Sequence, residues 1–254
     1  MRPRDRHAYI LVLPSMFTTG NLFCGFYSIV RSFNHDFERA AYAIILAGLF
    51  DLLDGRVARM TNSTSKFGVE YDSIADVVSF GVAPAILAYV WVLQPFGNIG
   101  WAAAFFFAAC GALRLARFNT IPEESQPKSY FIGLPIPAAA NMVSAAAILY
   151  HSFHFDYPHV IMLVAMFALG LLMVSSVRYR SFKDFDLRHR RSFFQLVLLV
   201  MLLAIAAIKP EITLAIIFGY YVLWGPIREG ASLLRRVASK KKDELSGEPR
   251  DEIR

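Results

Sequence analysis

Residues 51–76 read DLLDGRVARMTNSTSKFGVEYDSIAD, and their four aspartates decide how the rest of the chain is interpreted. The first pair, Asp51 and Asp54, is spaced by three positions. The second pair, Asp72 and Asp76, is spaced by four, so on a helix the members of each pair share one face. Two such helices side by side would gather four carboxylates, and a bare aspartate at membrane depth costs roughly 2.5–3.5 kcal/mol. Divalent cations that prefer oxygen ligands remove this cost, so we expect two Mg²⁺ or Mn²⁺ ions here.

Other residue types in this stretch suit a phosphate ligand. Gly55 has no Cβ and lets a ligand approach the backbone, and Arg59, one turn on, is placed to grip a phosphate. Gly68 is expected to let two helices approach closely. Carboxylates, an arginine and glycines are the parts of metal-assisted phosphoryl transfer. An isolated aspartate at a helix end is more often a cap or a partner of the helix dipole, but that interpretation does not explain four acids in this register.

The composition is that of a membrane protein. Hydrophobic residues make up 56% of the chain and the mean hydropathy is +0.44, values typical of a polytopic membrane protein. The net charge of +6 would also suit nucleic-acid binding, but the basic residues lie between apolar runs, which favours loops beside anionic lipid. Cys24 and Cys110 lie inside apolar runs without disulfide or zinc spacing, so we expect them to be small core residues.

The apolar runs predict an all-α polytopic protein with about eight transmembrane helices in one membrane domain, residues 1–230. The expected spans are residues 15–31, 39–60, 71–93, 101–117, 133–150, 160–177, 192–208 and 212–227. Before them, arginines and then an apolar run precede Pro14, so we predict a short interfacial helix over residues 1–13 that leads into the first span. The charged tail, residues 231–254, is expected to be frayed or disordered beyond Lys240.

Basic residues are distributed unevenly between the two ends of these spans. With an inside N-terminus and eight spans, 23 of the 26 Lys and Arg residues lie in cytoplasmic segments, and the external ones are Arg31, Arg39 and Lys209. This asymmetry predicts an integral protein of the cytoplasmic (inner) membrane with both termini in the cytoplasm. It also puts the four aspartates at the cytoplasmic face, where nucleotides and magnesium are available.

The spacing of the acidic stretch resembles the signature of the CDP-alcohol phosphotransferases. All eight fixed positions of that signature are matched without a gap: Asp51, Asp54, Gly55, Ala58, Arg59, Gly68, Asp72 and Asp76. Members of that family move a phosphate-bearing group from a CDP-linked donor to an alcohol and release CMP. The resemblance implies a core of six spans around a polar cavity, at about residues 14–178, two further helices at about 192–227, and a homodimer.

The resemblance also implies roles for individual residues. The four aspartates would hold two divalent ions, and Asp76 would in addition take the proton of the attacking hydroxyl. Gly55, Gly68 and Arg59 would contact the CDP-lipid. Ser65 lies where a small hydroxyl could reach a phosphate of the same donor.

Four further stretches resemble one branch of the family, the membrane-embedded phosphatidylserine synthases. They read PSMFTTGNLFCGFYSIV (14–30), DSIADVVSFGVAPAIL (72–87), RLARFN (114–119) and FIGLPIPAAA (131–140). The implied activity is transfer of the phosphatidyl group of CDP-diacylglycerol to the hydroxyl of L-serine, in membrane lipid and without a nucleic-acid partner. In the first stretch Asn21 is a polar residue in an apolar run, which would either face the CDP-lipid or make an interhelical hydrogen bond.

Serine brings a carboxylate that needs a cationic partner. Arg114 and Arg117, three positions apart near the cytoplasmic end of a span, are the candidates, and Lys66 is a weaker one. Anchoring of the span by positive charge explains the two arginines equally well, so both interpretations stay open at this point.

Other functions fit the same residues less completely. The acceptor could be glycerol phosphate or inositol, and the donor an archaeal ether lipid, because lipid chains meet only unspecific apolar surface. A cation-coupled transporter or channel would place acids at several depths, whereas the external halves of these spans are almost uncharged. A structural scaffold would leave the metal-spaced acids unexplained.

Overall fold

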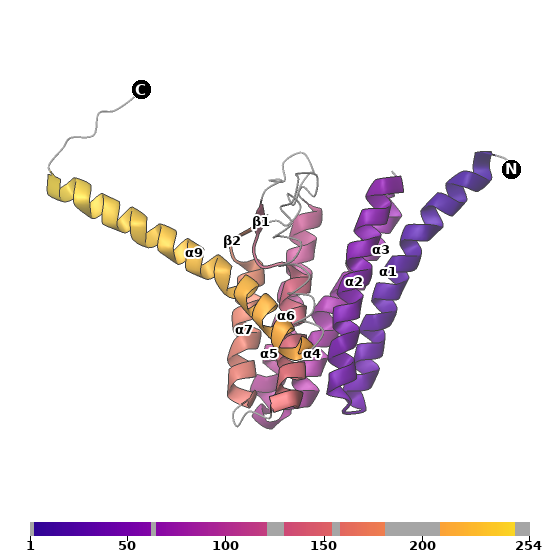
Figure 1. Cartoon of the computed structure of the whole chain (residues 1–254), viewed down its shortest axis with the longest axis horizontal. Helices are drawn as coiled ribbons and strands as arrows, with labels where there is room; N and C mark the ends of the chain where they lie inside the picture. Colours follow the sequence, from indigo (N-terminus) through magenta and orange to yellow (C-terminus); the bar gives the residue numbers. More distant parts are fainter. Residues whose placement is uncertain (1–2, 62–64, 121–129, 154–157, 181–208, 247–254) are drawn as a thin grey trace.

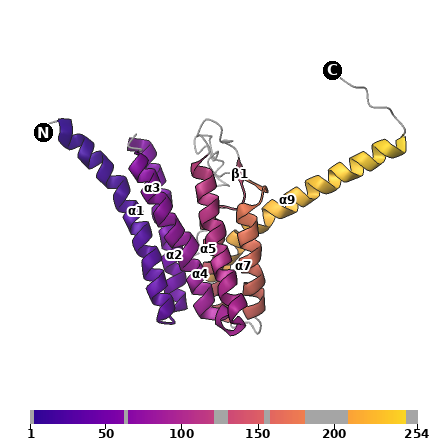
Figure 2. The same cartoon turned by 180° about the vertical axis from the view of Figure 1, so that it is seen from behind.

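The computed structural model describes residues 3–61, 65–120, 130–153, 158–180 and 209–246, which are helical apart from one short two-stranded ribbon (Figures 1 and 2). The helical class predicted from the sequence is confirmed for these residues. Most of the helices stand side by side in a bundle, and α9 (Pro210–Ser246) leaves the bundle at an angle (Figure 1).

The first two helices form an antiparallel hairpin. α1 (Pro3–Phe33) and α2 (Phe37–Thr61) are joined by a short turn in which His35 has a φ of 59°. The Asp36 carboxylate stabilises the turn, since it lies 3.0 Å from the guanidinium of Arg39 and 3.5 Å from that of Arg31. This ion-paired turn lies at the end of the hairpin that is far from the acids of α2.

The short interfacial helix predicted for residues 1–13 is not confirmed as an element distinct from the first span. α1 runs without interruption from Pro3 through Pro14 to Phe33, although its N-terminal part leans away from the bundle (Figures 1 and 2). A proline inside a helix removes one backbone hydrogen bond, and it often bends the helix without ending it. The apolar sequence on both sides of Pro14 continues the helix.

The second acid pair lies on a long apolar helical run, Lys66–Phe96. Its first part is α3 (Lys66–Asp76), and directly afterwards the backbone widens into a π-helical segment, η1 (Val77–Val82). The run continues through α4 (Ala83–Ala88), a second π-helical segment, η2 (Tyr89–Leu93), and a 3₁₀ turn, η3 (Gln94–Phe96). π-Helical segments are rare and are found frequently at functional sites, and η1 begins where the acid pair ends.

Among the described residues, three more helices belong to the bundle: α5 (Asn98–Asn119), α6 (Ile136–Phe153) and α7 (Pro158–Val174). An antiparallel ribbon, β1 (Tyr130–Ile132) paired with β2 (Arg178–Arg180), ties the start of α6 to the end of α7. The sequence did not predict this ribbon. Each strand is three residues long, and a pairing of such short, distant segments leaves no periodic pattern.

A glycine makes the connection from the ribbon to α6 possible. Gly133 has a φ of 75°, and its amide donates a hydrogen bond to the carbonyl oxygen of Val177 at 2.8 Å. A Cβ at this position would lie 2.3 Å from the carbonyl oxygen of Met173. Only glycine fits this backbone conformation and this close approach.

Small side chains let the helices pack closely. Alanines such as Ala47 and Ala103 are fully buried, and larger side chains such as Phe80 fill the spaces between them. On the outside, large apolar side chains such as Phe105 and Leu171 are exposed. An apolar exterior over a helical bundle is the surface expected of a protein that is surrounded by lipid.

Three described segments are long and apolar enough to cross a membrane: Lys66–Phe96, Asn98–Asn119 and Pro210–Gly230. A shorter apolar helix covers His159–Val174. These helices fit an integral membrane protein, but the predicted count of eight spans is not confirmed. The span predicted at residues 192–208 lies outside the described residues.

The charged tail is more regular than expected. α9 continues as a helix to Ser246, six residues beyond the predicted limit of order at Lys240, and residues 247–254 lie outside the described part. The residues after Gly230 are mostly Ala, Leu, Arg, Lys and Glu, which are strong helix formers. Their helix propensity therefore outweighs the high charge that suggested disorder.

Candidate active site

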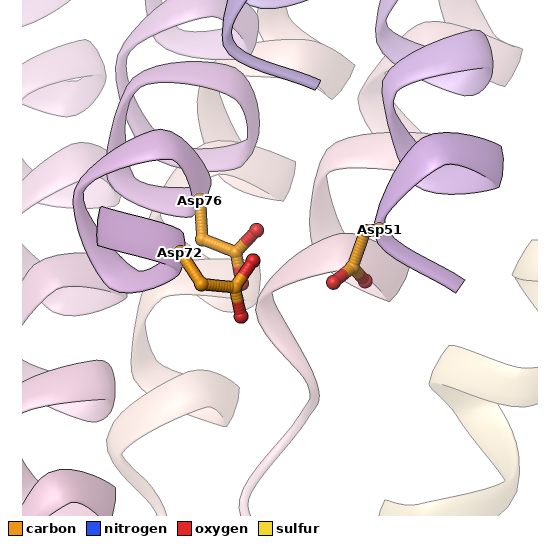
Figure 3. Close-up of side chains that lie close together, drawn as sticks. All are labelled: Asp51, Asp72 and Asp76. Atoms are coloured by element: carbon orange, nitrogen blue, oxygen red, sulfur yellow. The ribbon is translucent and has the colours of Figure 1, made fainter. Parts of the chain in front are cut away.

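Three aspartates from two helices converge at one point of the bundle (Figure 3). Asp51 comes from α2, whereas Asp72 and Asp76 lie one turn apart on α3. One carboxylate oxygen of each lies within 4.8 Å of the other two. Asp76 is buried, with 8% of its surface exposed, and the other two are half-buried. We call these three residues the acid cluster.

Asp54, the fourth predicted acid, does not join this group of three. It is buried on α2, and its carboxylate accepts a hydrogen bond from the Thr18 hydroxyl of α1. It still interacts electrostatically with Asp72 and Asp76. The predicted set of four is therefore a cluster of three with a fourth acid held beside it by α1.

Asn21 of α1 fixes the orientation of Asp76. Its side-chain amide nitrogen donates a hydrogen bond to Asp76 Oδ1 at 2.9 Å, and both residues are buried. The Ser79 hydroxyl of η1 donates to the backbone carbonyl of Asn21 at 2.9 Å. Gly25 permits this contact between α1 and η1, because a Cβ there would lie 2.3 Å from Ser79 Oγ. Of the two interpretations of Asn21, the structure has the interhelical hydrogen bond, and it ends on the acid cluster.

Among the described residues, the carboxylate oxygens of the acid cluster do not all have hydrogen-bond partners. Asp72 Oδ1 is fully buried and has no hydrogen-bond partner in the described part of the chain. Within those same residues, no ion pair joins a cation to any of the three aspartates. Unneutralised carboxylates at this separation repel one another, and a divalent ion that takes oxygen ligands would remove both defects. The donor set fits a metal site.

The residues expected to contact the donor lie around the connection from α2 to α3. Gly55 is the neighbour of Asp54 on α2, and Arg59 lies one turn further on, with its side chain outside the described part. Ser65 caps α3, since its Oγ accepts a hydrogen bond from the Gly68 amide at 3.0 Å. A hydroxyl that accepts in this way still has a proton to donate to a ligand.

The expectation that Gly68 lets two helices approach closely is wrong. Among the described residues, a Cβ at this position would meet only the Ser65 Oγ, at 3.2 Å. Gly68 lies in the first turn of α3, where its nearest neighbour is the capping hydroxyl and not another helix. Its lack of a side chain leaves space that a ligand can occupy.

Of the three predicted cations, the structure brings Arg114 toward the acid cluster. Arg114 is 8% exposed, interacts electrostatically with Asp76, and stacks on Phe118 with its guanidinium carbon 4.6 Å from the ring centroid. Its Nε is buried and has no hydrogen-bond partner among the described residues. Arg117 and Lys66 are both exposed, as expected of residues that anchor the protein.

Sequence reasoning missed the polar partners of the acids. Thr18 and Ser79 are ordinary hydroxyl residues within apolar runs, and their contacts arise from the packing of α1 against α2 and η1. One signal could have found Thr18. It lies three positions before Asn21, so the two polar side chains share one face of an otherwise apolar helix.

The amino-acid sequence of this chain is similar to those of known proteins. Residues 11–174 match the family model described as CDP-alcohol phosphatidyltransferase. A Helicobacter pylori protein named CDP-diacylglycerol–serine O-phosphatidyltransferase is 40% identical, over 92% of this chain and 97% of its own length. The protein of that name from Bacillus subtilis is 36% identical, over 67% of this chain and 91% of its own length. That from Methanocaldococcus jannaschii is 43% identical, over 56% of this chain and 63% of its own length.

The matched segment contains α2, α3 and Arg114, so it includes every residue of the acid cluster and the cation beside it. The Helicobacter pylori protein extends the similarity to most of the chain. The signature that suggested the family is thus accompanied by a match over more than half of the sequence, and the chain belongs to the CDP-alcohol phosphatidyltransferase family.

Proposed function

We propose that this enzyme transfers the phosphatidyl group of CDP-diacylglycerol to the hydroxyl of L-serine, forming phosphatidylserine and releasing CMP. The observation that carries the proposal is the convergence of Asp51, Asp72 and Asp76, together with the buried Arg114, which interacts electrostatically with Asp76. The names of the relatives point the same way, since they are serine O-phosphatidyltransferases. Acids suit a metal-bound diphosphate, and a buried arginine suits the carboxylate of an amino acid.

In this proposal the acid cluster holds divalent ions, Mg²⁺ or Mn²⁺. Asp51, Asp72 and Asp76 supply the converging oxygens, and Asp54 completes the set of four from beside the cluster. When bound, such ions neutralise the charge of the donor diphosphate. The protein's own part is to hold the acids in place, through Thr18 on Asp54 and Asn21 on Asp76.

Asp76 is the proposed base. The serine hydroxyl oxygen forms a bond to the phosphorus that carries diacylglycerol, and the bond from that phosphorus to the CMP oxygen breaks. The hydroxyl proton passes to the Asp76 carboxylate, and CMP leaves with the electron pair of the broken bond. Asn21 donates a hydrogen bond to Asp76 Oδ1, and Oδ2 is the oxygen that we propose to receive the proton.

Arg114 is the proposed partner of the serine carboxylate. Its guanidinium is desolvated, close to the acid cluster and without an ion pair in the described part of the chain. A charged donor left in this state gains most from an anionic ligand. Arg117 is exposed on the same helix and is assigned no part in the pocket.

The donor is proposed to lie along the α2–α3 connection. Gly55 and Gly68 leave room for its phosphates, Ser65 has a hydroxyl proton to donate, and Arg59 supplies positive charge. The first residues of α1, the end of α2, the start of α3 and the ribbon lie at the same end of the bundle, which supports an active site facing the cytoplasm (Figures 1 and 2). A homodimer in the membrane completes the proposal.

Release of CMP by purified protein in detergent tests the function. CDP-diacylglycerol and Mg²⁺ or Mn²⁺ would be supplied with L-serine, glycerol 3-phosphate or myo-inositol in parallel reactions. We expect CMP release that depends on serine, together with phosphatidylserine detected by mass spectrometry. Release with another alcohol but not with serine would contradict the serine assignment while leaving the family chemistry intact.

A further inference from the structure

Three residues meet about one helical turn from the acid cluster, on the side of the turn between α1 and α2. Gly48 lies three positions before Asp51 on α2, so the two share one face of that helix. Phe80 of η1 lies about one turn after Asp76 on the same helical run. A Cβ at Gly48 would lie 3.4 Å from Nδ2 of Asn141 on α6 and 3.9 Å from Cε1 of Phe80. We call Gly48, Phe80 and Asn141 the floor of the site.

Asn141 is the polar residue of this floor, and its side-chain oxygen lacks a partner. The residue is 8% exposed, and its Oδ1 is buried without a hydrogen-bond partner in the described part of the chain. A buried acceptor in this state lowers the stability of the fold. Ser144, one turn further along α6, differs, since its buried hydroxyl donates to the carbonyl oxygen of Ala140 at 3.1 Å. The amide of Asn141 is therefore available to a ligand.

The floor has space for a small group beside this amide. Both contacts of a Cβ at Gly48 are ordinary van der Waals distances, and no other described side chain comes within 4 Å apart from its neighbours in the chain. The space is that of a methyl or an ammonium group. Helical side chains lean toward the N-terminus of their helix, so the Asp51 carboxylate leans toward the turn that carries Gly48. A group in this space would contact the amide of Asn141 and lie next to an acid.

The oxygen of Asn141 and the neighbouring acid together indicate the chemistry of the ligand. An amide oxygen only accepts, so its partner must bring an N–H or O–H group. The two-fold torsion of an asparagine amide lets Oδ1 take the place of Nδ2. The phosphates and esters of the proposed donor only accept, its nucleotide is assigned to the α2–α3 connection, and the serine hydroxyl to Asp76. The ammonium group of serine remains, and its positive charge is favoured beside Asp51.

Arg114, the proposed partner of the serine carboxylate, flanks the same helical run from α5. Gly111 lies one turn before Arg114, and a Cβ there would lie 3.8 Å from the Cα of Gly81, the residue after Phe80. α5 and α6 both pack on η1. The two charged groups of one amino acid can therefore be bound on two sides of η1.

We propose that Asn141 binds the ammonium group of the acceptor amino acid, in the space over Gly48 next to the acid cluster. This inference rests on the proposed function, because it adds a second recognition group to that of the acceptor carboxylate. It explains why an unsatisfied amide is kept in the middle of an apolar bundle. The alternative is that Asn141 binds only a buried water molecule.

Asn141→Leu removes both polar atoms of the amide and keeps a similar side-chain volume. We expect the apparent KM for serine to rise by about 10–100-fold, as for loss of a hydrogen bond to a charged group. The KM for CDP-diacylglycerol and the Mg²⁺ dependence should stay within about twofold of the wild type. Asn141→Ala should give the same result and replaces the first variant if the leucine prevents folding. Ser144→Ala, which removes the satisfied hydroxyl of the same helix, is the matched control and should change neither KM.

Thermal unfolding in detergent without substrates separates binding from packing. Asn141→Leu removes an unsatisfied buried amide, so we expect its Tm to equal or exceed that of the wild type. A residue that only packs α6 on α2 would behave differently. A lower Tm, with both KM values and kcat changed together, would show that Asn141 is structural and would overturn the inference.

The failures of the two proposals are distinguishable. Wild-type protein that releases no CMP with serine overturns the proposed function and this inference together. Serine-dependent release with an unchanged serine KM in Asn141→Leu and Asn141→Ala overturns the inference alone and leaves a buried water as the partner of the amide. A weakened Mg²⁺ dependence with an unchanged serine KM also overturns it, because Asn141 would then serve the metal ions.

Discussion

The two sides of the site carry opposite charges, carboxylates on one and a guanidinium on the other, and the groups around these charges differ. On the α2–α3 side, the carboxylates of Asp51, Asp72 and Asp76 converge, and Asp76 accepts a hydrogen bond from the neutral amide of Asn21. On the α5 side, the buried Arg114 stacks on the ring of Phe118. In the described residues no ion pair joins the two sides, although Arg114 and Asp76 interact electrostatically.

The separation of these charges indicates which kind of ligand binds on each side of the site. Buried opposite charges normally pair, because an uncompensated buried charge is costly. Near the turn between α1 and α2, the same chain does pair them, with Asp36 between Arg31 and Arg39. At the site the acids and the arginine are kept apart and neutralised by nothing that the structure describes. We infer that cations complete one side and an anionic acceptor completes the other.

Removing the proposed base should have the largest effect. Asp76→Asn keeps the shape and the contact with Asn21 but cannot take a proton, so we expect CMP release to fall by about 10²–10⁴-fold. The matched control is Asp36→Asn, which removes an ion pair at the far end of the hairpin and should leave turnover nearly unchanged. Residual activity of Asp76→Asn close to that of the wild type would remove Asp76 as the base.

Removal of divalent ions should abolish turnover, because it leaves the carboxylates of the acid cluster without their cations. After exhaustive chelation we expect no serine-dependent CMP release, with recovery on addition of Mg²⁺ or Mn²⁺. Secondary structure, followed by circular dichroism, should persist in the chelated protein, because the helices are held by their own packing. Full turnover in the chelated enzyme would contradict the metal assignment.

Substitution of the buried arginine should change the KM for the acceptor, serine. Arg114→Ala is expected to raise the serine KM by about 10–100-fold, since a charged hydrogen bond contributes about 1.5–3 kcal/mol. Arg117→Ala, three positions along the same helix and exposed, is the control and should change it little. Equal effects of the two substitutions would show that both residues only anchor α5 at the membrane surface.

Removal of the hydrogen bond that Thr18 of α1 donates to Asp54 should have a smaller effect on turnover. Thr18→Val removes the hydroxyl that donates to Asp54 while keeping the side-chain volume. We expect the apparent affinity for Mg²⁺ in the turnover assay to weaken by about tenfold, as for other residues that orient metal ligands. Thr19→Val is the control, because Thr19 contacts Tyr71 and not an acid. An unchanged Mg²⁺ dependence in Thr18→Val would mean that Asp54 needs no orientation.

The packing of α9 should change stability more than turnover. Gly225→Ala places a Cβ against the Tyr179 ring, and such overpacking costs about 1–3 kcal/mol. Gly219→Ala lies on the same helix with no described atom within 4 Å, and we expect it to be neutral or stabilising. Thermal unfolding in detergent compares the two. A Gly225→Ala protein as stable as Gly219→Ala would show that α9 is not held by Tyr179.

The sequence predicted the local part of this site. The spacing of four positions placed Asp72 and Asp76 on one face of α3, because the helical repeat determines this, and in the structure their carboxylates meet that of Asp51. It did not predict that Asp54 turns to Thr18, since that depends on how α1 packs on α2. It also left Arg114 and Arg117 equivalent, although only the first is buried.

The acceptor side was harder to predict, because it too depends on packing between distant parts of the chain. Asn141 of α6 meets Gly48 of α2 through a contact between residues that are distant in sequence. Pairings of this kind leave no periodicity to recognise. The long continuous helix through Pro14 shows the opposite case, in which a strong local signal was overridden by the apolar residues on both sides.

Direct measurement of Mn²⁺ binding tests the central claim, that the acid cluster holds divalent ions. Electron paramagnetic resonance of purified protein in detergent, titrated with Mn²⁺ without substrate, reports the bound ions independently of turnover. We predict saturable binding to the wild type that is lost or strongly weakened in Asp72→Asn and retained in Asp36→Asn. No saturable binding to the wild type, or equal binding to Asp72→Asn, would contradict the account.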